Sequence, residues 1–296
     1  MSLWTAAEAA AWLTPPVATD DKYARGVLGL ATGSLDYPGA AVLGAEAALH
    51  TGVGMVRYLG PEPVGRLVLQ RRPEIVLGSG RVNAWVVGSG MPAPVADGDD
   101  AIEDPGEADR IGEALRSGAP VILDAAAIAR APESIGPVVI TPHAGELATL
   151  LGVAREEVAA DPVGHAARAA AAFGAVVLLK GATTVAARRS SRIDAEGEAV
   201  IEVHEATPWL ATAGAGDALA GILGALVATR SAREGRVTPD DLLALGATAA
   251  FVHGRAARLA ARARELDGSG GGPFTVLELC AAVPEVVRGL LSPGVD

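Results

Sequence analysis

Short runs of branched aliphatic residues recur along the chain and alternate with longer alanine-rich segments. The runs predict six buried β-strands, which lie within residues 26–33, 54–60, 84–90, 120–125, 136–142 and 175–181. The alanine-rich segments have apolar residues at helical spacing and predict helices at 38–51, 107–117 and 162–173. Apolar strands that alternate with helices are typical of a parallel sheet covered on both faces, so the pattern predicts an α/β fold.

The pattern changes after Lys180. The segments "TTVAA" and "AVIEVH" flank a polar turn at 188–198, which predicts a β-hairpin at the edge of the sheet. From Asp217 onward the apolar residues recur at helical spacing, so the last third of the chain is expected to be mostly helical. Two stretches rich in glycine, proline and acidic residues, 91–106 and 267–273, have no separate core beside them and are expected to be surface loops.

The chain is expected to form one domain over residues 1–296. Residues 1–20 are expected to be an N-terminal extension before the first predicted strand. The N-terminus has no basic residues followed by an apolar stretch, so no signal peptide is predicted. No window of 18 residues is apolar without interruption, and we therefore expect a cytoplasmic protein with no membrane partner.

Composition and charge narrow the class of protein. Half of the residues are hydrophobic but only 3% are aromatic, so the core is expected to be aliphatic. The chain has 24 basic and 35 acidic residues, a net charge of -11, and its arginines form no cluster typical of a nucleic-acid surface. Nucleic acid is therefore not expected as a partner. Cys280 is the only cysteine, which excludes an internal disulfide and a cysteine metal cluster.

Small and polar residues gather where the predicted strands end. They are Gly33–Ser34, Gly88–Gly90, Asp124, Thr141–His143 and Lys180–Gly181. In open α/β sheets the carboxyl ends of the parallel strands share one edge, and ligands bind there. We therefore expect the chemistry of this protein at that edge of the sheet.

The stretch "ATAGAGDALAG", residues 211–221, has a single charged residue, Asp217, directly before an apolar helical run. The free N–H groups of a helix N-terminus attract anions, and glycines at 214 and 216 would let a phosphate approach the main chain. A carboxylate beside a phosphate is suited to deprotonating a hydroxyl that attacks the phosphoryl group. The same residues are also compatible with an ordinary helix start, in which Asp217 is only a favourable N-terminal charge.

Several motifs appear in the order found in one known family. They are "GSLDYPGAAVLGAEAALHTGVGMVRY" at 33–58, "VVGSG" at 86–90, "VITPHAGELATLLG" at 139–152, "VVLLKGATTVAA" at 176–187 and "GAGDALAGILGAL". Together they cover about residues 20–290 and resemble the ADP-dependent NAD(P)H-hydrate dehydratase branch of the ribokinase-like proteins. The resemblance implies a three-layer α/β/α sandwich with a mostly parallel central sheet.

The resemblance also implies a reaction. Members of this family repair the S-epimer of hydrated NADH or NADPH (NADHX or NADPHX) and consume ADP or ATP, with Mg²⁺ as the cofactor. The ring hydroxyl is thought to be phosphorylated and the phosphate then lost, so that ADP yields AMP and phosphate. The family further implies a homo-oligomer, for which a tetramer is one candidate. An epimerase is expected as a separate protein, because only about 20 residues precede the first predicted strand.

The motifs carry the family's site residues onto this chain. Asp217 matches the catalytic carboxylate, which also contacts the substrate. The positions that match nucleotide contacts are Lys180, Gly181, Ala182, Thr183, Thr184, Gly214 and Gly216. The positions that match contacts to the hydrate are Ala40, Gly88, Gly90 and His143. Glu146 matches an acidic residue that helps to hold Mg²⁺ through water in related kinases, but it could equally cap the helix that follows.

The chain departs from the family pattern at several positions. Ser89 replaces a usual proline, Ala126 replaces an aspartate, and Ala215 replaces a threonine. Asp124 could bind a metal-bound water or only cap its turn. Two other functions therefore stay open: a ribokinase-like kinase acting on a hydroxymethylpyrimidine, a thiazole or a sugar with ATP, and a catalytically silent nucleotide-binding protein.

Overall fold

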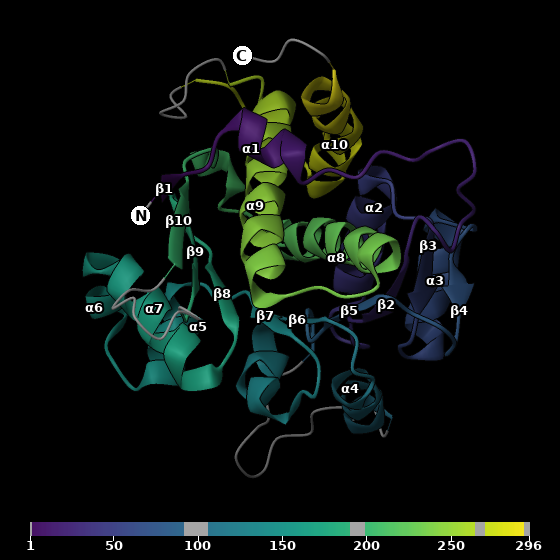
Figure 1. Cartoon of the computed structure of the whole chain (residues 1–296), viewed down its shortest axis with the longest axis horizontal. Coiled ribbons are helices and arrows are strands. Elements are labelled where there is room, and N and C mark those ends of the chain that lie inside the picture. The colour runs from purple at the N-terminus through teal and green to yellow at the C-terminus, as the bar shows by residue number, and fades with distance from the viewer. Residues whose placement is uncertain (1, 92–105, 190–198, 264–269, 293–296) are drawn as a thin grey trace.

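In the computed structural model, the chain folds into three layers, with helices on both faces of a ten-stranded sheet (Figure 1). The structure describes residues 2–91, 106–189, 199–263 and 270–292. The expected α/β class with a mostly parallel central sheet is confirmed. None of the helices in these ranges combines the length and the apolar character that a membrane span requires.

The sheet has the strand order β1-β10-β9-β8-β7-β6-β5-β2-β3-β4. All neighbours from β8 to β4 run parallel, whereas β9 is antiparallel to both β8 and β10. The strands are β1 (Ser2–Leu3), β2 (Val27–Ala31), β3 (Met55–Tyr58), β4 (Val76–Leu77), β5 (Ala84–Val87), β6 (Val121–Leu123), β7 (Val138–Ile140), β8 (Val176–Leu179), β9 (Thr184–Arg188) and β10 (Ala199–Val203).

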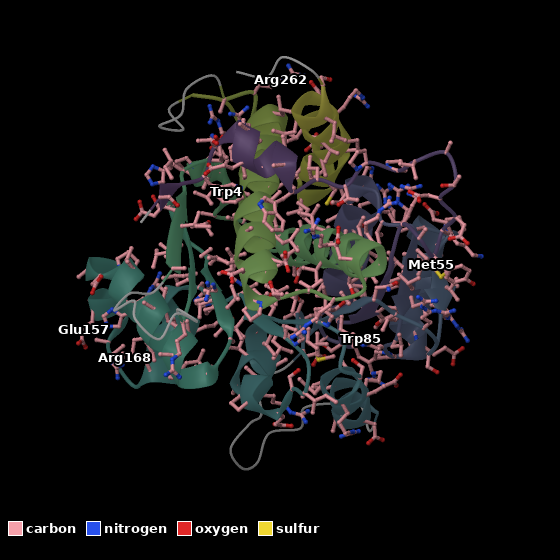
Figure 2. All side chains as sticks on the ribbon, viewed as in Figure 1. Trp4, Met55, Trp85, Glu157, Arg168 and Arg262 are labelled. Atoms are coloured by element: carbon pink, nitrogen blue, oxygen red, sulfur yellow. The ribbon has the colours of Figure 1, made fainter. Side chains whose placement is uncertain are left out.

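Side chains fill the spaces between the elements (Figure 2), and the buried hydrophobic ones form two separate clusters, one on each face of the sheet. One lies under α1 (Ala6–Ala11), α2 (Pro38–Thr51), α3 (Glu62–Arg71), α8 (Ala215–Glu234), α9 (Pro239–Ala261) and α10 (Val276–Leu291). The other lies under α4 (Glu107–Arg116), the 3₁₀ helix η1 (Ala125–Glu133), α5 (Ala144–Leu151), α6 (Arg155–Ala160) and α7 (Pro162–Phe173). Because strands alternate their side chains between the faces, both clusters draw on the same central strands.

Most elements expected from the hydrophobic pattern are confirmed, including the three helices and the helical last third. The hairpin is confirmed by the antiparallel pair β9 and β10, although 190–198 of its turn lie outside the described residues. Most of the expected loop at 91–106 and the first part of that at 267–273 also lie outside them. The first strand comes earlier than predicted, because Ser2–Leu3 pairs with β10 in a stretch too short to show periodicity.

The helix α8 crosses the centre of its layer and is buried without interruption over residues 218–228. Small residues permit this close packing: a side chain on Gly221 would collide with the Gly44 carbonyl of α2. A side chain on Gly224 would collide with Val86 of β5. The packing therefore fixes α8 against the sheet, so that the N-terminus of α8 lies at the edge formed by the carboxyl ends of the strands.

Candidate active site

The strand ends that the sequence singled out converge at one edge of the sheet with the N-terminus of α8. Asp124, directly after β6, is the centre of this cluster and is only 5% exposed. Its carboxylate accepts hydrogen bonds from Ser89 Oγ at 2.9 Å, Thr141 Oγ1 at 2.7 Å and Lys180 Nζ at 2.7 Å. These donors come from the ends of β5, β7 and β8 respectively. A buried carboxylate needs such partners, because an unpaired one would be costly to remove from water.

The backbone after Asp124 has an unusual conformation. Ala125 has φ of 47°, in the left-handed region that alanine rarely adopts. Such strain costs about 1 kcal/mol or more and is found mainly at functional sites. Here it turns the chain sharply from β6 into η1 and leaves the Asp124 side chain among its three donors.

The start of α8 is formed as the "GAGD" stretch predicted. Gly214 is the N-cap residue, and its φ of 89° favours glycine. A Cβ on Gly214 would lie 2.5 Å from Leu43 Cδ1 of α2, so a side chain there would also collide. A Cβ on Gly216 would lie 3.5 Å from Lys180 Nζ and 4.0 Å from Asp124 Oδ2. The first turn of α8 thus lies directly against the Asp124 cluster.

Asp217 is partly buried in this first turn. Burial and the nearby negative charge of Asp124 raise the pKa of Asp217 to about 6, while the positive charge of Lys180 and the Ser89 hydroxyl act in the opposite direction. A carboxyl group with this pKa is mostly ionised at neutral pH and is a stronger base than an ordinary aspartate. The arrangement combines a helix N-terminus, an ammonium group and a basic carboxylate.

His143 and Glu146 form a capping box at the start of α5. The His143 Nδ1 atom accepts from the N–H groups of Gly145 and Glu146 at 3.0 and 3.1 Å, so Nε2 carries the proton in the neutral ring. The Glu146 carboxylate accepts from the His143 N–H at 2.7 Å. The capping reading of Glu146 is therefore confirmed. His143 is 60% exposed, so Nε2–H can donate to a ligand.

Two glycines bring the turn after β5 close to its neighbours. A side chain on Gly90, which has φ of 66°, would collide with the Ala40 side chain at the start of α2. A side chain on Gly88 would collide with the Asp124 carbonyl. In addition, the Gly33 N–H donates to the Ser89 carbonyl at 2.7 Å. Ala40, Gly88 and Gly90 thus form one small-residue wall beside the Asp124 cluster.

The "KGATT" segment begins at the same edge. The Lys180 N–H donates to the Pro142 carbonyl at 2.8 Å, which ties the end of β8 to the turn before α5. Residues 181–183 form the exposed or half-exposed connection to β9, and Thr184 is the first residue of that strand. All site residues expected from the sequence therefore belong to segments of this one edge. Sequence reasoning missed the role of Thr141, and it treated Ser89 only as a replaced turn residue.

Comparisons with known proteins point to one family. A family model described as NAD(P)H-hydrate dehydratase matches residues 28–269. The chain belongs to the NAD(P)H-hydrate dehydratase family. The ribokinase-like fold expected for such a chain is also confirmed.

Individual relatives show how much of this chain is similar to known proteins of the family. A bifunctional NAD(P)H-hydrate repair enzyme Nnr of Mycobacterium leprae is 39% identical over 268 residues, which cover 86% of this chain and 50% of the relative. An ADP-dependent (S)-NAD(P)H-hydrate dehydratase of Xanthomonas campestris is 31% identical, over 83% of this chain and 84% of the relative. The chain spans about half the length of the Nnr relatives it matches.

A solved structure extends the comparison to the fold. The ADP/ATP-dependent NAD(P)H-hydrate dehydratase of Bacillus subtilis, co-crystallised with ATP and Mg²⁺, superposes with a TM-score of 0.76 at 26% identity. The match covers 98% of both chains. The similarity in fold therefore extends over nearly the whole chain.

Proposed function

We propose that this chain catalyses the ADP-dependent dehydration of the S-epimer of NADH hydrate or NADPH hydrate, giving the reduced dinucleotide, AMP and phosphate. The observation that carries the proposal is Asp217, a partly buried carboxylate with a raised pKa in the turn that an anion would occupy. An ordinary helix start would place its acidic residue in water, where its pKa would stay low.

The nucleotide is held by groups of two kinds. The free N–H groups at the start of α8, around Gly214 and Gly216, face the phosphates of ADP, and the helix dipole favours their negative charge. Lys180 supplies a full positive charge 3.5 Å from the position of a Cβ on Gly216. Gly181, Ala182, Thr183 and Thr184 follow with backbone and hydroxyl donors for the rest of the nucleotide.

Asp217 accepts the proton of the substrate's ring hydroxyl as that oxygen attacks the terminal phosphorus of ADP. An oxygen–phosphorus bond forms, the bond to the AMP oxygen breaks, and the hydroxyl becomes a phosphate ester. The ring nitrogen then expels phosphate, loss of a ring proton restores the double bond, and the dehydration is complete. The step needs a base that is ionised near neutral pH, which the pKa of about 6 for Asp217 provides.

The substrate lies against the small-residue wall of Ala40, Gly88 and Gly90. The two glycines let the turn after β5 pack closely against the Asp124 carbonyl and Ala40, where a Cβ would collide. The exposed His143 donates from Nε2 to an oxygen of the substrate.

The site also fits Mg²⁺ delivered with the nucleotide. No group of three or more metal-ligating side chains occurs in the described part of the chain. However, the carboxylates of Asp124 and Glu146 lie 2.7 and 3.9 Å from the same Lys180 Nζ. Mg²⁺ usually takes one or two carboxylates and fills its other positions with water and phosphate oxygens, so these two residues would hold it, directly or through water. Bound there, it would neutralise charge on the nucleotide phosphates.

The direct test is the recovery of absorbance at 340 nm after the protein is mixed with NADHX, Mg²⁺ and ADP. Recovery that requires the nucleotide, and that is lost in Asp217→Asn, supports the dehydratase. Absence of recovery with both ADP and ATP, from protein that binds nucleotide by calorimetry, would refute it and favour a ribokinase-like kinase. Parallel assays with NADPHX and with ATP give the substrate and nucleotide preference.

A further inference from the structure

The helix α9 packs against α8 on the same face of the sheet (Figure 1) and carries a buried histidine that no part of the proposed reaction uses. His253 is 7% exposed, and its Nε2 atom lies 2.9 Å from the carbonyl oxygen of Ala215, the first residue of α8. A carbonyl can only accept, so Nε2 carries the hydrogen and donates it. Burial lowers the pKa of His253 to about 4, which keeps the ring neutral at physiological pH.

The same part of α9 also holds the other end of the connection that leads into α8. Glu205 follows β10 and is 8% exposed. Its carboxylate accepts from Arg255 Nε and from Arg258, both at 3.0 Å. Gly254 has no side chain where a Cβ would lie 2.6 Å from the Glu205 carbonyl carbon. The backbone of α9 therefore contacts the start of the connection directly.

The middle of the connection is exposed. Residues 211–213 lie at the surface, and the printed sequence there is "ATA". The main-chain hydrogen bonds of this part are local, such as Thr212 N–H to the Leu210 carbonyl at 2.8 Å. Its position thus depends on the anchored residues on either side, Glu205 and Leu210 before it and Ala215 after it.

We propose that His253 is a positioning residue, which holds the first turn of α8 in register with the Asp124 cluster by its hydrogen bond to Ala215. This inference rests on the proposed function of that turn. Gly216 and Asp217 directly follow Ala215, so a displacement of this peptide moves the phosphate-binding N–H groups and the base together. A misplacement of about 1 Å can cost about 100-fold in rate. Both turnover and ADP affinity should therefore depend on His253, although His253 touches neither ligand.

The experiment compares four variants. His253→Leu removes the donor with little change of volume. His253→Asn and His253→Gln both carry an amide donor, but only glutamine reaches the position of the imidazole Nε2. Thr248→Val is the matched control, because it removes another buried hydrogen bond of α9, from Trp4 Nε1 at 3.3 Å, away from the site.

For each variant we measure kcat and KM for NADHX, the ADP dissociation constant by calorimetry, and the melting temperature. We expect His253→Leu and His253→Asn to lose about tenfold or more in kcat and about fivefold or more in ADP affinity. His253→Gln should recover most of both. Thr248→Val should melt at a lower temperature with both constants within about twofold of wild type. If His253→Leu does not fold, the comparison of His253→Asn with His253→Gln still tests the inference.

Two outcomes would overturn the inference. In one, His253→Asn equals wild type in both kcat and ADP affinity. In the other, Thr248→Val loses as much as His253→Leu, which would make the effect one of general stability. Failure of the proposed function gives a different result, because the wild-type protein would then not convert NADHX. The ADP affinities of the variants would still test the role of His253.

Discussion

Replacing Asp217 with asparagine should remove activity and increase the stability of the protein. The amide has nearly the same shape but cannot accept the substrate's proton, and loss of a general base typically costs about 10²- to 10⁴-fold in rate. ADP should bind about as well as before, because the N–H groups at the start of α8 are retained. The same substitution also removes a charge that the folded state accommodates poorly.

The size of the stability gain follows from the pKa of Asp217. The folded pKa is about 6 and the ordinary value is 3.8, so the folded state binds this proton more tightly than the unfolded state. The protonated side chain of Asp217 therefore stabilises the folded state below about pH 4. This stabilisation is lost as the pH rises through about 6, because the side chain then ionises. A shift of roughly two units corresponds to about 3 kcal/mol at most. Because Asp217 is only partly buried, we expect about 2 kcal/mol.

The assay is urea unfolding of the free protein at pH 4 and pH 7.5, without Mg²⁺ or nucleotide. The free-energy difference between Asp217→Asn and wild type should be small at pH 4 and should reach about 2 kcal/mol in favour of the variant at pH 7.5. Asp109→Asn, which neutralises an exposed carboxylate of α4, is the control. A difference that does not change with pH would refute the electrostatic reasoning. Turnover within about tenfold of wild type would refute the assignment of the base.

Three further results are expected. Lys180→Ala should raise the ADP dissociation constant about tenfold or more; an unchanged value by calorimetry would remove Lys180 from the nucleotide site. Ser89→Ala should move the acid limb of the pH–rate profile to higher pH, because the Ser89 hydroxyl lowers the pKa of Asp217; an unmoved limb would contradict this. Gly90→Ala should raise KM for NADHX and lower the melting temperature, since its Cβ would collide with Ala40; wild-type values for both would show that the wall does not contact the substrate.

The sequence predicted the elements that have strong local patterns. The six strands and the start of α8 at "GAGD" could be placed because hydrophobic period, glycines and helix-end chemistry act over a few residues. The short elements β1, β4 and η1 could not, because two-residue strands and a 3₁₀ helix have no period to detect. The parallel order also allows the strand ends to be assigned to one edge from the sequence alone.

What the sequence by itself determined is thus the fold class, the site-bearing edge and the identity of the residues on it. Only the tertiary structure decided how those residues act on one another. Ser89 and Asp124 are 35 residues apart in the chain yet hydrogen-bonded, and His253 contacts a carbonyl 38 residues away. The raised pKa of Asp217 depends on burial and on Asp124 as a neighbour. Burial and charge proximity are set by which strand ends and helices meet in space, and no local pattern encodes that meeting.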